Sequence, residues 1–277
     1  MSVSELVSCE WLAERLERGD HSDILVVDVS WFSNKDGRGE YLREHIPGAV
    51  YLNVMEGAEH SHVYPRNLPT PEVFQANVRA VGVASDTHVI LYSRTDKLGF
   101  MASGRAWWMF KYFGHDKVSV LNGGWQKWCL DGHPKTSELP YVKEGNFTAH
   151  VQKKYRREYD ELKVLSVSPP DSSSAQIIDT RPSAAFLAGH LPGAINIPAD
   201  SLMDTGRSEM RDKDSLIALY RQAGVDLEKP VVSHCNSGMS SCTMALALSE
   251  CGYQLWAVYM GGYKEWQHKN TTDGNKE

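Results

Sequence analysis

The sequence predicts an α/β protein of two tandem domains, each a mostly parallel sheet with helices on both faces. Three observations lead to this prediction. The 277 residues are enough for two hydrophobic cores of ordinary size. The second half of the chain repeats landmarks of the first half in the same order. Within each half, short apolar runs alternate with stretches of helical periodicity.

The internal repeat is clearest in two copies of one motif. His45-Ile-Pro-Gly-Ala-Val-Tyr-Leu reappears 145 positions later as His190-Leu-Pro-Gly-Ala-Ile-Asn-Ile. An apolar run that ends in aspartate precedes each copy, at Asp28 and Asp179. Two more landmarks follow each copy, a strand-like run before Ser93 or Cys235 and a glycine pair at Gly123 or Gly261. Because solenoid repeats are about 20–50 residues long, this period indicates duplicated domains.

The second half shows the alternation most clearly. Its strand candidates are residues 177–179, 194–197, 231–234 and 256–259. Its helix candidates are residues 183–188, 214–223 and 240–251. In the first half, residues 104–113 match the last of these helices, and we interpret their Trp107, Trp108 and Phe110 as core or domain-interface packing rather than as a cofactor site. Strands alternating with helices predict a mostly parallel sheet covered on both faces.

The change in pattern between the repeats sets the expected domain limits. We predict a first domain over residues 1–137, a connector over residues 138–162 and a second domain over residues 163–277. The connector is rich in Lys, Arg, Glu and Tyr and has little periodicity. Residues 167–174 contain a Pro-Pro pair and a serine run, which are typical of a surface loop.

Composition and charge exclude several classes of function. Hydrophobic residues make up 42% of the chain and charged residues 23%, which is ordinary for a globular protein and excludes a disordered one. A net charge of −6 argues against binding to nucleic acid or to anionic membranes. No apolar run in the sequence approaches the ~18–20 residues of a membrane helix. The acidic N-terminus lacks a signal or transit pattern, so we expect a cytoplasmic protein, with mitochondria as the second choice.

Five cysteines are an odd number and too few for a disulfide framework in a chain of this length. Four of them (Cys9, Cys129, Cys242 and Cys251) are interpreted as packed thiols, with a resolving role for Cys242 as the alternative. Cys235 differs, because it follows the apolar run 231–234 and precedes small residues that lead into the helix expected from Ser240.

That position suits a nucleophile. Backbone N–H groups of such a loop, together with the positive end of the helix dipole, stabilise a thiolate. Gly238 allows the backbone angle that such a loop requires. A thiol with a lowered pKa is a nucleophile, so Cys235 is predicted to be catalytic. The alternative is a buried thiol at the end of a strand.

These motifs together resemble the two-domain rhodanese-type sulfurtransferases. The shared pattern is Asp, then His-x-Pro-Gly-Ala, then Cys-x-x-Gly-x-Ser, then Gly-Gly-aromatic, and it spans about residues 5–267. The loop Cys235-Asn-Ser-Gly-Met-Ser240 is similar to the Cys-Gly-Ser-Gly-Val-Thr loop of 3-mercaptopyruvate sulfurtransferases. Thiosulfate-using rhodaneses carry Arg and Lys directly after the cysteine, where this chain has Asn236 and Ser237.

The resemblance implies a sulfurtransferase reaction in two steps. Cys235 takes sulfur from 3-mercaptopyruvate as a persulfide and releases pyruvate, and an acceptor such as thioredoxin, a small thiol or cyanide then removes the sulfur. It also implies that Ser237 polarises the substrate and that Arg181 binds the substrate carboxylate. The remaining loop residues expected to bind substrate are Asn236, Gly238, Met239 and Ser240. The resemblance implies neither a cofactor nor a metal ion.

The chain departs from this family at the substrate end of the site. The family's second carboxylate-binding arginine lies in an insert that is absent between Arg181 and His190. Arg66 stands where the first domain of the family supplies a histidine, and no clear counterpart of that domain's aspartate is found. Arg66 either replaces the missing cation or is an ordinary exposed loop residue. Ser93, the counterpart of Cys235, cannot form a persulfide, so the first domain is expected to be catalytically silent.

Three other functions share features with this sequence. A thiosulfate sulfurtransferase is the second choice. A phosphatase of the His-Cys-x5-Arg type needs a guanidinium six residues after the cysteine. This chain has Ser241 there, which argues against a phosphatase. A non-enzymatic rhodanese-like binding module usually lacks the cysteine or the compact loop, and Cys235 and Gly238 supply both.

Overall fold

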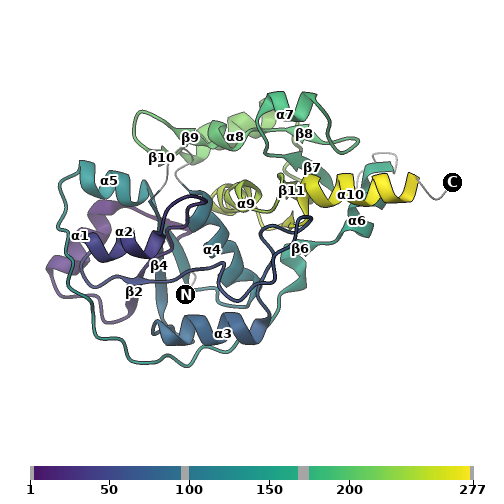
Figure 1. Ribbon diagram of the computed structural model, residues 1–277. Helices are drawn as coiled ribbons and strands as arrows, with labels where there is room; N and C mark the ends of the chain where they lie inside the picture. The colour runs from purple at the N-terminus through teal and green to yellow at the C-terminus, as the bar shows by residue number, and fades with distance from the viewer. Residues whose placement is uncertain (1–2, 95–99, 168–174, 275–277) are drawn as a thin grey trace. The chain divides into compact units, whose positions relative to one another are not determined.

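The computed structural model describes residues 3–94, 100–167 and 175–274 (Figure 1). The chain divides into two compact units. The first consists of Met1–Gly57, Pro69–Gln152 and Asp204–Met210, and the second of Ala58–Leu68, Lys153–Met203 and Arg211–Glu277. Each unit contains a five-stranded sheet whose neighbouring strands are parallel, which confirms the predicted fold class.

The sheet of the first unit has the strand order β1-β5-β4-β2-β3. Its strands are β1 (Leu6–Val7), β2 (Ile24–Asp28), β3 (Val50–Tyr51), β4 (His88–Tyr92) and β5 (Val118–Leu121). Its helices are α1 (Cys9–Glu17), α2 (Gly37–Arg43), α3 (Pro71–Ala80), α4 (Met101–Tyr112) and α5 (Gly124–Leu130).

Strand β4 is buried on both faces. Ile90 and Tyr92 share one hydrophobic cluster with Leu12 of α1 and Trp128 of α5. The alternate residues Val89 and Leu91, which point to the opposite face, are also fully buried. A central parallel strand is continuously apolar because helices cover both of its faces.

Helix α4 is packed into the core of the first unit. Trp107, Trp108 and Phe110 are all 0% exposed, which confirms their interpretation as core residues. The side chain of Trp107 keeps a polar contact, because its Nε1 donates to the Glu5 carboxylate at 2.8 Å. A buried indole N–H needs such an acceptor.

The sheet of the second unit has the equivalent order β6-β12-β11-β7-β8. Its strands are β6 (Arg156–Arg157), β7 (Gln176–Asp179), β8 (Ile195–Asn196), β11 (Val231–His234) and β12 (Trp256–Tyr259). Its helices are α6 (Tyr159–Val167), α7 (Ser183–Leu187), α8 (Lys213–Gln222), α9 (Ser240–Glu250) and α10 (Gly262–Gly274), with short 3-10 helices η1 (Lys153–Tyr155) and η2 (Ala199–Leu202). The short strands β9 (Met203–Asp204) and β10 (Glu209–Met210) pair with each other.

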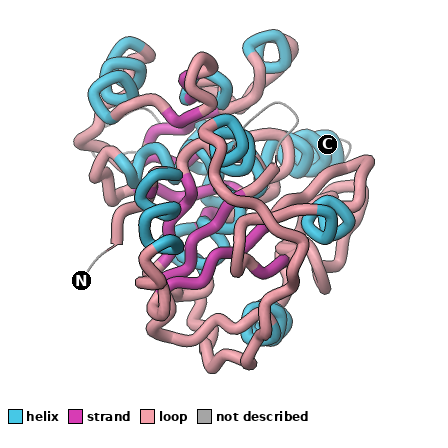
Figure 2. The backbone as a smooth tube through the Cα atoms, turned by 90° about the vertical axis from the view of Figure 1, so that its left-hand side faces the viewer, coloured by secondary structure: helices cyan, strands magenta, loops and turns pink. Residues whose placement is uncertain are grey.

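The core of the second unit lies on both faces of its sheet. Leu162 of α6 packs in one cluster with Val232 of β11, and Trp266 of α10 packs against this cluster. Helix α9 contacts β11 and β12 and buries its residues 241–249. Figure 2 shows helices (cyan) on both sides of strands (magenta).

The expected connector, residues 138–162, proves to be partly regular. It contains η1, strand β6 and the first residues of α6. Strand β6 joins the sheet at its edge, where Arg156 pairs with Val258 of β12. A two-residue edge strand is too short to give a periodic signal in the sequence. The expected surface loop 167–174 lies outside the described residues, apart from Val167, which ends α6.

Helices α5 and α10 were not predicted from the sequence, although each begins directly after a glycine of the repeated Gly-Gly pair. Gly123 and Gly262 adopt positive φ angles of 86° and 62°. A side chain at either position would be strained, which explains why the turn uses glycine. No described helix is long and apolar enough to cross a membrane.

Candidate active site

Three strand ends meet at the carboxyl edge of the second sheet. His234, the last residue of β11, pairs with Asp179 at the end of β7 and with Tyr259 at the end of β12. Cys235 follows immediately and is 4% exposed. Open α/β sheets bind ligands at this edge, so the cysteine lies where the sequence predicts a site.

The loop after Cys235 directs hydrogen-bond donors at its sulfur. The backbone N–H groups of Gly238 and Met239 lie 3.2 and 3.3 Å from Sγ, and Ser241 Oγ lies 3.6 Å from it. Helix α9 begins at Ser240, and no side chain caps its N-terminus. Gly238 and Met239 directly precede this helix, so their N–H groups lie outside its internal hydrogen bonds and donate to the sulfur. Gly238 has a φ of 76°, which permits this curl.

These donors decide the ionisation of Cys235. Burial alone would raise the pKa of the thiol. Hydrogen bonds from the backbone and hydroxyl of Ser241, with contributions from Ser237 and Ser240, outweigh burial and lower the pKa below its ordinary value of 9.0. The site therefore favours a thiolate in a nearly closed environment, which is the reactive form of cysteine.

Arg66 reaches this loop from the segment 58–68, which belongs to the same unit. Its Nη1 donates a hydrogen bond to Ser237 Oγ at 2.5 Å. Ser237 is 4% exposed and Arg66 is half-buried. Both residues line a cavity of about 240 Å³, together with Arg156, Met260 and Glu265. The structure thus brings Arg66 into contact with the cysteine loop.

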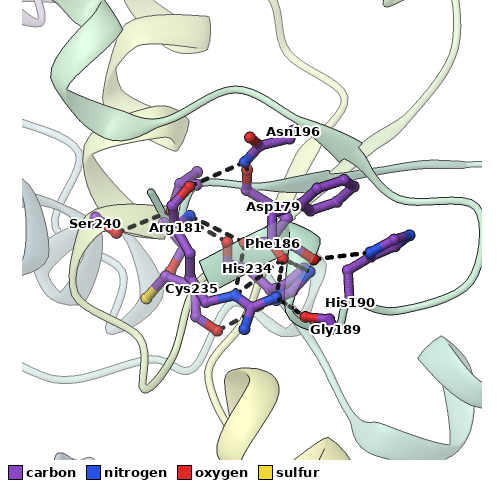
Figure 3. Close-up of polar contacts among 11 residues, drawn as sticks. Asp179, Arg181, Phe186, Gly189, His190, Asn196, His234, Cys235 and Ser240 are labelled. Atoms are coloured by element: carbon purple, nitrogen blue, oxygen red, sulfur yellow. Dashed lines mark hydrogen bonds and ion pairs between the residues drawn. The ribbon is translucent and has the colours of Figure 1, made fainter. Parts of the chain in front are cut away.

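Arg181 lies at the same sheet edge but is held by its own neighbours (Figure 3). Its Nε and Nη2 bind the carboxylate of Asp179 at 3.0 and 2.6 Å, and Nη2 also donates to the carbonyl oxygen of Gly189 at 2.7 Å. The guanidinium stacks 3.8 Å from the centre of the Tyr263 ring. Its assignment to a substrate carboxylate remains a prediction.

The other predicted loop residues differ in their surroundings. Ser240 Oγ lies 2.9 Å from Thr180 Oγ1, which ties the start of α9 to the end of β7. Met239 is buried, whereas the side chain of Asn236 is exposed. Asn236 therefore presents its side chain to solvent beside the loop.

Several residues at the site escaped prediction from the sequence. Ser241 was considered only as evidence against a phosphatase, yet its hydroxyl contacts the sulfur. Its place in the first turn of α9, six residues after the cysteine, was the available signal. On the cavity wall, Glu265 accepts a hydrogen bond from Tyr64 at 2.7 Å and pairs with Lys269 at 2.7 Å. The Tyr64–Glu265 contact has no local signal in the sequence, because it joins residues 201 positions apart, whereas Glu265 and Lys269 are four residues apart on α10.

The first unit shows what the repeat becomes without the thiol. Ser93 follows β4 as Cys235 follows β11, and its hydroxyl donates to Ser103 Oγ at 3.3 Å. Within the described residues, no backbone N–H is directed at this hydroxyl. Residues 95–99, which follow Ser93 as the donor loop follows Cys235, lie outside the described residues, so the silence of this domain stays a prediction.

The rhodanese-like domain family matches residues 8–131 and 164–269 of the chain. The class of protein is defined by two α/β domains with the same strand order. The second domain surrounds a cysteine with hydrogen-bond donors. The chain belongs to the rhodanese family. It is a two-domain rhodanese-type sulfurtransferase, which confirms the resemblance seen in the sequence.

The chain is similar to thiosulfate sulfurtransferases and to 3-mercaptopyruvate sulfurtransferases. The thiosulfate sulfurtransferase of Gallus gallus is 36% identical over 276 residues, covering 95% of this chain and 93% of the relative. The 3-mercaptopyruvate sulfurtransferase of Escherichia coli strain K12 is 34% identical over 284 residues, covering 96% of each chain. The crystal structure of SseA from Escherichia coli, described as a 3-mercaptopyruvate enzyme, superimposes with a TM-score of 0.82 at 32% identity and covers 94% of this chain and 99% of its own.

Proposed function

We propose that the protein transfers sulfur from 3-mercaptopyruvate, through a persulfide on Cys235, to a thiol acceptor or to cyanide. The observation that carries the proposal is the surroundings of Cys235 Sγ, which combine amide and hydroxyl donors with a loop that has no side-chain cation. Such donors stabilise a sulfur anion without favouring a compact dianion.

In the first step, the thiolate of Cys235 attacks the sulfur of mercaptopyruvate. The new S–S bond forms as the C–S bond breaks, and the electron pair of the C–S bond remains on carbon as the enolate of pyruvate. The thiol proton of the donor ends on that carbon, so the products are pyruvate and a persulfide anion. The oxygen of the developing enolate needs a hydrogen-bond donor, and Ser237 is the proposed one.

In the second step, an acceptor attacks the outer sulfur of the persulfide. Cyanide leaves as thiocyanate, a small thiol leaves as its persulfide, and a dithiol such as reduced thioredoxin becomes a disulfide with release of hydrogen sulfide. In each case Cys235 returns as a thiolate. The donors that surround its sulfur stabilise this leaving group as well as the nucleophile, so they serve both half-reactions.

Thiosulfate is the second candidate donor. The specific observation in its favour is the Arg66 guanidinium at Ser237, which brings a cation to a loop that has none of its own. The relatives named thiosulfate sulfurtransferase, at 34–36% identity, point the same way. Attack on this donor would release sulfite and leave the same persulfide.

The two donors are separated by steady-state kinetics on one preparation. We expect kcat/KM for mercaptopyruvate to exceed that for thiosulfate by at least ~10-fold, or about 1.4 kcal/mol of differential transition-state binding. Thiocyanate formation from cyanide serves as the common readout. A preference for thiosulfate would overturn the choice of donor but leave persulfide chemistry intact. Absence of thiocyanate with both donors would overturn the proposed function itself.

A further inference from the structure

Either donor requires a cation close to Cys235. Mercaptopyruvate carries a carboxylate and thiosulfate a sulfonate-like group, and an anion buried without a partner is costly. The loop residues 236–239 contribute no charged side chain. Arg181 and Arg66 are the two arginines that the sequence singles out, and the structure distinguishes them.

Arg181 already neutralises a buried carboxylate. Asp179 is 0% exposed, and the Arg181 guanidinium binds both of its oxygens. The Arg181 side chain is itself only 7% exposed. Turning it toward an incoming carboxylate would leave Asp179 buried without its counter-charge, which is among the most destabilising changes in a protein interior.

The first unit repeats the same arrangement without the thiol. Asp28, the counterpart of Asp179, has the Arg94 guanidinium 3.8 Å away, and that guanidinium stacks 3.8 Å from the centre of the Trp125 ring. Arg94 follows strand β4, whereas Arg181 follows β7, so different positions supply the same Asp–Arg–aromatic group. Ser93 cannot carry sulfur, yet this group persists beside it. The arrangement is therefore explained by the packing of the strand ends rather than by substrate binding.

Arg66 differs from Arg181 in what it contacts. Its Nη1 donates to Ser237 Oγ at 2.5 Å, two residues after the nucleophile, and both side chains line the cavity of about 240 Å³. Arg156 lines the same cavity but is paired with Glu158 at 2.7 Å, and the carboxylates of Glu158 and Glu265 also lie on the wall, so Arg66 is the cation that contacts the cysteine loop. A guanidinium on a cavity wall can hold a carboxylate or sulfonate through two parallel hydrogen bonds.

The Arg66–Ser237 contact also fixes the direction of the Ser237 hydroxyl. A guanidinium has five N–H donors and no acceptor, so Ser237 Oγ must accept from Arg66. The hydroxyl proton is then left to donate to another group. Because Arg66 cannot remove that proton, Ser237 acts here as a hydrogen-bond donor and not as a base or nucleophile.

We infer that Arg66, and not Arg181, binds the anionic group of the sulfur donor in this cavity and orients the Ser237 hydroxyl as a hydrogen-bond donor to the reacting part of the substrate. The inference rests on the proposed function, because it names the residue that binds the sulfur donor. It predicts that removal of the Arg66 charge weakens donor binding while the chemistry of Cys235 persists.

The kinetic test uses the full chain with three variants. Arg66→Gln should lower kcat/KM for mercaptopyruvate about 10- to 150-fold, mainly through a higher KM, because a charge-assisted hydrogen bond is lost. Arg66→Lys should recover much of the loss, because it restores the charge. Arg221→Gln, on the exposed face of α8, is the matched control and should behave as wild type. Removal of sulfur from fully loaded enzyme by dithiothreitol, which is uncharged, should change less than 3-fold in each variant.

A binding test does not depend on turnover. Pyruvate should slow the alkylation of Cys235 by iodoacetamide in wild type and in Arg221→Gln, and lose this protection in Arg66→Gln. The same experiment with sulfite in place of pyruvate tests whether Arg66 also binds a sulfonate-like group. An unchanged KM with retained protection in Arg66→Gln would overturn the inference. If wild type is not persulfidated by either donor, the proposed function fails instead, so the two failures are distinguishable.

Discussion

The guanidinium of Arg181 binds the carboxylate of Asp179 through Nε at 3.0 Å and Nη2 at 2.6 Å. The same Asp179 oxygen that accepts from Nη2 lies 3.6 Å from Nε2 of the buried His234. Burial lowers the pKa of His234, which favours its neutral form despite the neighbouring carboxylate. Arg181 is therefore the main counter-charge of Asp179, and the stability of the strand ends beneath Cys235 depends on this pair.

Replacement of Arg181 should destabilise the fold. Arg181→Met leaves a fully buried carboxylate without its partner, and we expect the free energy of unfolding to fall by about 3–5 kcal/mol. Urea denaturation followed by tryptophan fluorescence measures this change. The double variant Asp179→Asn/Arg181→Met should recover part of it, because the amide oxygen still accepts from the backbone N–H of Arg181 and no charge remains. If Arg181→Met were as stable as wild type and had a raised KM for the sulfur donor, Arg181 would be the residue that binds the donor.

Cys235 alone should carry the transferred sulfur. After treatment with donor, intact mass should rise by one sulfur atom, and Cys235→Ser should abolish both this increase and turnover. Cys251→Ser is the matched control, because this half-buried thiol at the end of α9 has a pKa raised to about 11 by burial. If Cys235→Ser kept its activity and Cys242→Ser lost it, the nucleophile would be Cys242 and not Cys235.

The reactivity of Cys235 should follow the ionisation of its thiol. Because the folded protein lowers the pKa below 9.0, alkylation by iodoacetamide should rise with pH and reach half its maximum below pH 9.0. Ser241→Ala removes a donor that stabilises the thiolate, so the pKa should rise and the curve should move to higher pH. At pH 7 we expect the alkylation rate of Ser241→Ala to be roughly 2- to 12-fold lower than that of wild type, which corresponds to the free energy of one hydrogen bond.

The matched control for Ser241 is Ser183→Ala, an exposed serine at the start of α7. Its alkylation curve should coincide with that of wild type. A Ser241→Ala curve that also coincides with wild type would show that the hydroxyl does not act on the sulfur. The remaining donors, the backbone of Ser241 and contributions from Ser237 and Ser240, would then account for the lowered pKa.

Donor preference should respond to charge added at Asn236. This side chain is exposed beside the loop, so Asn236→Arg places a second cation near Cys235 without removing a contact of Ser237. We expect kcat/KM for thiosulfate to rise at least ~3-fold while that for mercaptopyruvate changes little, because the dianion gains more from a nearby cation. Asn236→Gln controls for the change in size. An equal gain for both donors would show that the loop charge does not select between them.

Much of this architecture could be read from local patterns. The strands 231–234 and 256–259 match β11 and β12, because a strand buried on both faces must be continuously apolar. Cys235 was identified by the order strand, small residues and helix, which fixes where the backbone donors point. Edge strand β6 and helices α5 and α10 escaped, because two residues or an uneven apolar pattern give no period to detect.

The sequence by itself determined the duplicated α/β fold and the family, and it singled out Cys235 as the predicted nucleophile, because each of these depends on short local motifs. Only the tertiary structure decided what surrounds that nucleophile. It placed Arg66 against Ser237, 171 positions away, and engaged Arg181 with Asp179 rather than leaving it in the cavity. The physical reason is that the partner of a charged side chain is set by burial and by distance in space. A buried carboxylate must find its counter-charge, and no local pattern states which arginine supplies it.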